Sequence, residues 1–241
     1  MQGGRTTVAA RYRLTSMRID RAGWPFITGP LAPAAVLAAA GRAGGRRGLR
    51  LAAWPFALLS AYMALFFRDP DRRCDAEAPA PDDVLSPADG VVMVAGEPQE
   101  GVAPEPAPEG DWQQVSVFLS VVDVHVNRSP YHGEVVESSY RRGSFLAAYR
   151  KESAHRNERS ELWLRDGDRT VVFRQIVGVL ARRIVTRTGV GRRLATGERM
   201  GLMKFGSRMD VFVPRDCTVL VRVGQRVRGG ETVIARWSGA R

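Results

Sequence analysis

The sequence has little cysteine, histidine or lysine, and each shortage excludes a class of protein. Two cysteines, Cys74 and Cys217, lie far apart in the 241 residues, which rules out a disulfide-rich scaffold and a CxxC zinc site. Three histidines leave little material for a histidine metal site, so no metal is expected. Lysine occurs only at 151 and 204, so 34 of the 36 basic residues are arginine. Because the chain has only 25 acidic residues, its net charge is +11. This charge predicts an anionic partner: nucleic acid, an anionic membrane surface or an acidic substrate.

Two runs without a charged residue, 22–41 and 51–67, occupy the N-terminal third. As a helix the second would be about 26 Å long, close to the ~30 Å of a bilayer core. Arginines lie before, between and after the runs, so two full crossings would place one basic cluster on the far side of the membrane, against the positive-inside tendency. The sequence therefore favours an in-plane or re-entrant hairpin over two spans. A cleaved signal peptide, or two buried helices of a soluble core, would also account for apolar runs of this kind.

The rest of the chain predicts a β-rich body. A polar, proline-bearing linker covers 69–83, so we expect a basic and apolar membrane-anchoring region over 1–68 and a catalytic domain over 84–241. Many short β-branched runs separated by glycine turns predict a mainly β fold, sandwich-like or barrel-like, after an apolar helical hairpin. One helix is expected over 143–152. The expected strands are 91–95, 115–122, 133–137, 161–165, 170–186, 210–213, 218–223 and 232–237.

A short internal repeat supports the β prediction. The pattern Gly-x-x-apolar-x-x-Gly-Glu occurs at 191–198 and again at 224–231, each time between strand-like runs. Glycines at this spacing supply the positive φ angles of tight turns. The repeat therefore predicts turn and hairpin architecture.

Four strings hold the polar residues best suited to chemistry. In the second of them, alternation along a strand places Asp123, His125 and Asn127 on one face, which suits a site better than a core. The other three contain turn-like or polar residues whose role is not evident from any one string alone. The four strings are SPADG (86–90), DVHVNRSP (123–130), GSF continuing to NER (143–159) and GLMKFGSRMDVFVP (201–214).

In their order and approximate spacing these strings resemble phosphatidylserine decarboxylase proenzymes, of the short bacterial and archaeal branch. The resemblance covers roughly 80–240, and the apolar N-terminal hairpin is also similar. It implies decarboxylation of phosphatidylserine to phosphatidylethanolamine and CO2 in phospholipid biosynthesis, through a Schiff base with a pyruvoyl group. In this family the proenzyme cuts itself at a Gly-Ser bond, here Gly206-Ser207, and the pyruvoyl group derives from the serine.

The same resemblance implies a heterodimer of a β chain, 1–206, and an α chain, 207–241. The arginine clusters predict that it lies at the cytoplasmic face of the cell membrane. A homo-oligomer is left open, and no nucleic-acid partner is expected. Ser207, His125 and Asp89 are the expected catalytic residues. His125 is the expected proton donor because imidazole titrates near neutrality, and Asp89 would orient or activate a neighbour.

Two arginines are expected to bind the substrate. Arg128 and Arg208 match the lipid phosphate as bidentate donors. Longer bacterial members of the family carry a second histidine at the position of Arg128, as part of an Asp-His-Ser self-cleavage triad. Arginine is a poor base, so the activation of Ser207 is left to His125, or to Asp89 through water.

Two other functions fit part of the sequence. A membrane-anchored basic β module could bind anionic lipid or nucleic acid without catalysis, but it does not account for Gly206-Ser207 within its 14-residue string. A pyruvoyl enzyme acting on a soluble amino acid would not need the two apolar runs.

Overall fold

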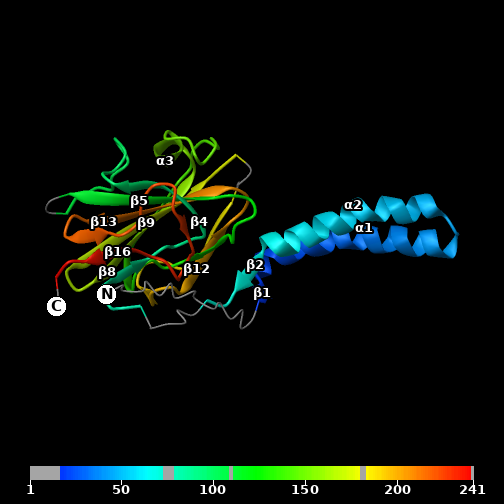
Figure 1. The fold of residues 1–241 in the computed structure, drawn as a ribbon, viewed down its shortest axis with the longest axis horizontal. Coiled ribbons are helices and arrows are strands. Elements are labelled where there is room, and N and C mark those ends of the chain that lie inside the picture. The colour runs from blue at the N-terminus through cyan, green and yellow to red at the C-terminus, as the bar shows by residue number, and fades with distance from the viewer. Residues whose placement is uncertain (1–16, 73–78, 109–110, 180–182, 240–241) are drawn as a thin grey trace, which may run out of the picture.

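The structure of the protein is a computed structural model, which describes residues 17–72, 79–108, 111–179 and 183–239. A long helical hairpin projects from one end of a β-rich body (Figure 1). Cys74 lies outside the described residues.

The hairpin consists of α1 (Trp24–Ala43) and α2 (Arg47–Phe66), preceded by a 3-10 turn at Arg21–Gly23. Each α-helix has 20 residues and is long and apolar enough to cross a membrane. Only 17% and 22% of the two apolar windows are buried, so the interpretation as two buried helices of a soluble core is wrong. Their exposed large apolar side chains are Trp24, Phe26, Leu31, Val36, Leu51, Trp54, Phe56, Leu58, Leu59 and Leu65.

The body is built on one eight-stranded antiparallel sheet. Its central strand, β13, is hydrogen-bonded to β9 on one side and to β5 on the other. In order across the sheet the strands are β11 (Arg193–Leu194), β7 (Gly133–Arg141), β8 (Arg159–Asp166), β9 (Arg169–Val177), β13 (Ser207–Pro214), β5 (Trp112–Leu119), β4 (Gly90–Gly96) and β15 (Arg226–Val227).

Three smaller antiparallel sheets complete the described fold. One has the order β10 (Ile184–Thr186), β12 (Arg199–Met203), β6 (Val126–Arg128). The second has the order β14 (Cys217–Val219), β16 (Val233–Trp237), β3 (Asp83–Leu85). The third pairs β1 (Met17–Ile19) with β2 (Arg68–Pro70) at the base of the hairpin.

The main core lies between the eight-stranded sheet and the two three-stranded sheets. It joins Val117 of β5, Met203 of β12 and Ile234 of β16 in one buried cluster. A second cluster attaches the hairpin to the body, because Phe66 of α2 packs with Leu202 of β12. The mainly β body with a preceding helical pair is thus confirmed.

The helix expected over 143–152 is wrong. The helix in this region is a single turn, α3 (Ser153–Arg156). The preceding segment is held away from helical geometry because the Asn157 side chain bonds both the N–H and the C=O of Leu146, at 2.9 and 2.7 Å.

The internal repeat forms the two edges of the large sheet. Its copies supply β11, paired with β7, and β15, paired with β4. Gly191 and Gly224, which open the two copies, have φ angles of +85° and +84°. The turn architecture predicted from the repeat is confirmed.

Candidate active site

The Gly206-Ser207 peptide lies at the start of β13, in the middle of the large sheet. Ser207 is opposite Leu119 of β5 and Val177 of β9. The two residues before it both have left-handed backbone, with φ +64° at Phe205 and +60° at Gly206. A positive φ is uncommon for a bulky residue such as Phe205 and costs on the order of 1–3 kcal/mol. The chain is therefore strained immediately before the peptide that the resemblance marks for cleavage.

The Ser207 hydroxyl is buried and has no hydrogen-bond partner among the described residues. Beside it, the carbonyl oxygen of Gly206 lies against Gly178, where a Cβ would be 2.2 Å from that oxygen. Only glycine at 178 allows this approach, because a methyl group would collide with the backbone. The arrangement presents an unbonded nucleophile next to a closely held carbonyl.

His125 is a titratable side chain that contacts the peptide directly before this one. Its Nε2 accepts the N–H of Gly206 at 3.2 Å, and its Nδ1 lies 3.0 Å from the carbonyl oxygen of Asp123. A carbonyl only accepts, so the proton of the neutral ring is on Nδ1 and the lone pair is on Nε2. The ring is completely buried, 4.2 Å from the ring centroid of Phe66.

Burial lowers the pKa of His125 from 6.5 to about 4, because the interior disfavours the imidazolium ion. The carbonyl and charge of Asp123 and the charge of Asp89 act in the opposite direction, and the nearby charge of Arg68 adds to the lowering. The expectation that His125 titrates near neutrality is therefore wrong for this uncut chain. At neutral pH the ring is an uncharged base.

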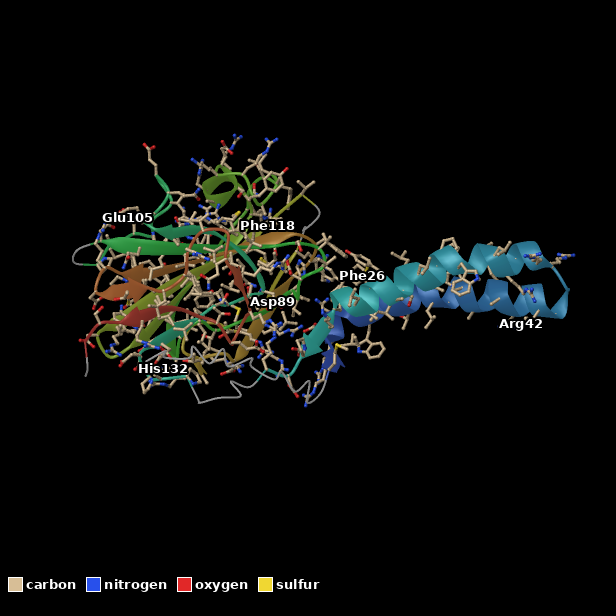
Figure 2. All side chains as sticks on the ribbon, viewed as in Figure 1. Phe26, Arg42, Asp89, Glu105, Phe118 and His132 are labelled. Atoms are coloured by element: carbon tan, nitrogen blue, oxygen red, sulfur yellow. The ribbon has the colours of Figure 1, made fainter. Side chains whose placement is uncertain are left out.

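An aromatic cluster attaches the hairpin to this site. Phe205 lies 4.5 Å from Phe66 and 6.4 Å from Phe67, measured between ring centroids. Phe26 of α1 stacks on Phe67 at 5.3 Å. The residue before Gly206 is thus held by the base of the hairpin, and Figure 2 shows Phe26 at that base.

Asp89 is near His125 but is bonded elsewhere. Both of its carboxylate oxygens pair with the guanidinium of Arg72, and one accepts the N–H of Gly229 at 2.8 Å. Arg72 also donates to the carbonyl of Gly229 at 2.9 Å. Asp89 therefore joins the segment before the catalytic domain to the C-terminal part of the chain, and its expected catalytic role stays a prediction.

The two arginines expected to bind phosphate are both buried and bonded to protein acceptors. Arg128 donates to the carbonyls of Pro70 and Gly197 at 2.9 and 3.1 Å, and burial lowers its pKa to about 10. Arg208 is 1% exposed and donates to Asp210 and Ser116. As the neighbour of Ser207 on β13, Arg208 faces the other side of the sheet. A lipid phosphate would have to displace these bonds, so the assignment stays a prediction.

The GSF and NER strings have a structural role that the sequence did not reveal. Asn157 is completely buried, and its amide donates to Leu146 and, at 2.8 Å, to the carbonyl of Val177. Val177 is the residue paired with Ser207. The string therefore fixes a loop to the end of β9 beside the candidate cleavage site.

Two cations lie at the hairpin base, and sequence reasoning gave neither a place beside the site. Arg68, the first residue of β2, donates to the carbonyls of Leu65 and Val122. Lys204 lies over the ring of Phe26, with its Nζ 4.7 Å from the centroid. Lys204 lies in the string 201–214 and Arg68 among the arginines after the second apolar run, but their places at the hairpin base depend on how the hairpin meets the body, which the sequence does not show.

The fold and the site define a class: a mainly β protein with an apolar helical hairpin and a buried serine and histidine at a strained Gly-Ser peptide. Residues 59–235 match the family model described as phosphatidylserine decarboxylase. The chain belongs to this family.

Several relatives are similar over most of the chain, and each carries the name phosphatidylserine decarboxylase proenzyme. The one from Symbiobacterium thermophilum is 44% identical over 226 residues, covering 90% of this chain and 95% of its own. The one from Solibacter usitatus is 43% identical over 186 residues, covering 77% and 84%. The one from Saccharopolyspora erythraea is 40% identical over 243 residues, covering 98% and 95%.

Proposed function

We propose that this chain decarboxylates phosphatidylserine to phosphatidylethanolamine and CO2, with a pyruvoyl group that it makes by cutting itself between Gly206 and Ser207. Family membership supports the decarboxylation. The observation that carries the self-cleavage is the meeting of an unbonded buried Ser207 hydroxyl, the closely held Gly206 carbonyl and a neutral His125.

The first step is an acyl shift. Ser207 Oγ attacks the carbonyl carbon of Gly206, the bond from that carbon to the Ser207 nitrogen breaks, and an ester forms. The proton of the hydroxyl passes to the leaving nitrogen. His125 is our candidate to carry it, because its Nε2 is an uncharged base beside the scissile peptide, although it must first release the N–H of Gly206 that it accepts at 3.2 Å. Strain at Phe205 and Gly206 is released when the peptide opens.

Elimination completes the cut. Residue 207 loses its Cα proton, its Cβ–Oγ bond breaks, and the Gly206 carboxylate leaves. Water then replaces the nitrogen, which departs as ammonia, and residue 207 becomes the pyruvoyl end of the α chain. Once formed, this group supplies the electron sink for decarboxylation through a Schiff base with the substrate amine.

Cleavage also changes the setting of His125. In the uncut chain its Nε2 is occupied by the N–H of Gly206. Release of Gly206 frees that atom, and an anionic substrate beside it raises the pKa of the ring. This is the change that a proton donor to the substrate's α-carbon requires.

We assign the hairpin to membrane anchoring at the cytoplasmic face of the cell membrane. Its base holds Phe205, so the proposed cleavage site lies next to the base of the apolar helices. Val121 and Val122 are 37% and 55% exposed, and a Cβ on Gly206 would meet the Val121 side chain at 3.9 Å. A two-tailed lipid leaves the bilayer at ~0.8 kcal/mol per exposed CH2, so a site placed at the membrane suits this substrate.

The intact masses of the purified chains test the self-cleavage. We expect the wild type to separate into chains 1–206 and 207–241, the smaller one ending in pyruvoyl, and Ser207→Ala to remain one polymer of 241 residues. Ser160→Ala, at another buried serine, is the matched control and should be cut normally.

Release of CO2 from carboxyl-labelled phosphatidylserine in mixed micelles tests the reaction. Wild type and Ser160→Ala should release it, and Ser207→Ala should not. Activity in an uncut chain would refute the pyruvoyl assignment. A cut chain that released CO2 from free serine but not from the lipid would refute the substrate.

A further inference from the structure

A chain of buried amides and hydroxyls crosses from one sheet to another beside the cleavage site. Thr186, Gly201 and Asn127 lie in one row across the sheet β10-β12-β6. Gln175 of β9 reaches this row from the large sheet. Its Nε2 donates to Asn127 Oδ1 at 2.8 Å, and its Oε1 accepts the hydroxyl of Thr186 at 2.8 Å.

The middle residue of the row makes room for this contact. A Cβ on Gly201 would lie 3.0 Å from Gln175 Nε2, so a side chain there would crowd the amide. The Gln175 amide therefore sits over a glycine and between two hydrogen-bonding neighbours. The orientation of the Gln175 amide determines the orientation of Asn127. The Oδ1 of Asn127 accepts the Gln175 amide, and its NH2 has no acceptor among the described residues.

Asn127 Nδ2 is completely buried and has no hydrogen-bond partner in the described part of the chain. An unmade bond at a buried donor costs on the order of 1–3 kcal/mol. The Asn127 side chain is held in place by Gln175, which Thr186 holds in turn, yet its donor stays unbonded among the described residues. A fixed, buried and unbonded donor indicates a binding site for a ligand.

The position of Asn127 relative to residue 207 follows from two strands. Asn127 lies in β6, and His125, which directly precedes this strand, contacts Gly206. Its partner Gln175 is two residues from Val177, which pairs with Ser207. Two residues along a strand are about 6.5 Å, so Gln175, which is bonded to Asn127, is one side-chain row along β9 from the partner of Ser207, and the free amide is placed one such row from the reacting residue.

We propose that Asn127 binds the substrate, its free amide N–H donating to the carboxylate of the seryl head group while the head-group amine is joined to residue 207. This inference rests on the function proposed above. In phosphatidylserine the amine and the carboxylate are on the same carbon, so a donor one row from residue 207 is placed for the carboxylate. A single donor fixes the direction of the bond from the α-carbon to the carboxylate, which is the bond that breaks. Because this donor is neutral, it stabilises the carboxylate less than an arginine would.

The sharpest variant is Asn127→Asp. It keeps the size of the side chain and the oxygen that accepts from Gln175, and it replaces only the free NH2 with an oxygen that repels a carboxylate. Thr188→Val is the matched control, because Thr188 Oγ1 is another buried atom without a partner among the described residues. Gln175→Glu is the second variant, since a carboxylate at 175 turns the Asn127 amide and removes the free donor without touching Asn127.

The experiment measures covalent capture of two lipids. Cut protein is mixed with micelles of phosphatidylserine or phosphatidylethanolamine and treated with cyanoborohydride, and the mass of the 207–241 chain reports the amine adduct. The product lipid lacks the carboxylate. We expect Asn127→Asp and Gln175→Glu to need about tenfold or more phosphatidylserine for half-capture, with phosphatidylethanolamine capture and the Thr188→Val control unchanged.

An equal change for both lipids, or no change for either, would overturn the inference. So would a folded Asn127→Asp and a folded Gln175→Glu that both stay uncut, because Asn127 would then serve self-cleavage. The wild type separately reports on the proposed function: without a 207–241 chain, or without capture of either lipid, that proposal fails on its own.

Discussion

At the residue scale, the burial of His125 determines the pH range that we expect for the proposed self-cleavage. With a pKa lowered by burial to about 4, the ring stays an uncharged base throughout the range in which an exposed histidine would gain its proton. We expect the rate at which fresh precursor forms the 207–241 chain to stay level from about pH 8 to 5 and to fall only near the lowered pKa. His125→Gln, which can still accept the Gly206 N–H, should slow cleavage ~100-fold or more. A midpoint near pH 6.5 would contradict this role.

The lowered pKa of His125 also affects the free energy of unfolding. This effect is measured in Ser207→Ala, in which we expect the chain to stay uncut. The pKa of His125 is lowered from 6.5 to about 4, so between these values the unfolded chain binds more protons than the folded one. The free energy of unfolding therefore falls with falling pH across this range, by up to ~3 kcal/mol. Urea unfolding of Ser207→Ala with and without His125→Gln isolates this contribution.

The site was predictable from the sequence where short strings carried it. The string 201–214 drew attention to Gly206-Ser207, and the string 123–130 drew attention to His125 and Asn127. The strand alternation expected along 123–127 is wrong for its first part, because β6 begins only at Val126 and Asp123 is bonded to Ser120 in a turn. The pKa of His125, the ion pair of Asp89 and the burial of Arg128 were not predictable, because each depends on side chains distant in sequence.

At the element scale, the hairpin raises the question of how deeply it enters the membrane. Twenty residues at ~1.5 Å each give about 30 Å, the thickness of a bilayer core. Exposed large apolar side chains occur along both helices, and Ser60 of α2 bonds the Ile27 carbonyl of α1 at 2.8 Å. Arg42 lies near the tip, far from the body (Figure 2). Length and surface favour a span, whereas the arginines favour the in-plane or re-entrant placement expected from the sequence.

Thiol labelling at the tip separates these placements. In a Cys74→Ser background, Gly45→Cys should react with an impermeant maleimide added to the far side of sealed vesicles if the hairpin spans. It should react only from the side of the body if the hairpin stays in one leaflet. Cys217 is buried and burial raises its pKa, so it contributes little background. Val223→Cys on the exposed body is the control for sidedness.

The elements themselves were largely predictable, and the misses have physical reasons. Most strands rich in β-branched residues were found from that enrichment, because such residues pack well on the surface of a sheet. The run 170–186, expected as one strand, is divided between β9 and β10. Strand β12 was missed because its sequence, RMGLM, contains no β-branched residue. It is a strand because it pairs with β10 on one side and β6 on the other. The helix at 143–152 was predicted from the spacing of apolar residues. It does not form because the Asn157 side chain bonds the backbone of Leu146.

At the scale of the whole molecule, cleavage would leave 207–241 held without a covalent link. β13 is paired along its whole length with β5 and over most of it with β9, and β15 and β16 join β4 and β3. Phe212 also packs in a cluster with Trp112 and Trp163, and Arg174 lies 4.8 Å from its ring centroid. We therefore expect the two chains to copurify and to unfold in one transition.

Phe212→Ala tests whether this packing holds the cut protein together. Loss of a buried phenylalanine costs about 3–5 kcal/mol. In the uncut Ser207→Ala background that loss should appear only as a lower free energy of unfolding, independent of protein concentration. In the cut protein the same loss should also release the 207–241 chain on dilution, seen by size exclusion, because association is then bimolecular. Val223→Ala, at an exposed side chain, should change neither. Retention of the small chain by diluted, cut Phe212→Ala would show that pairing in the sheet suffices without this cluster.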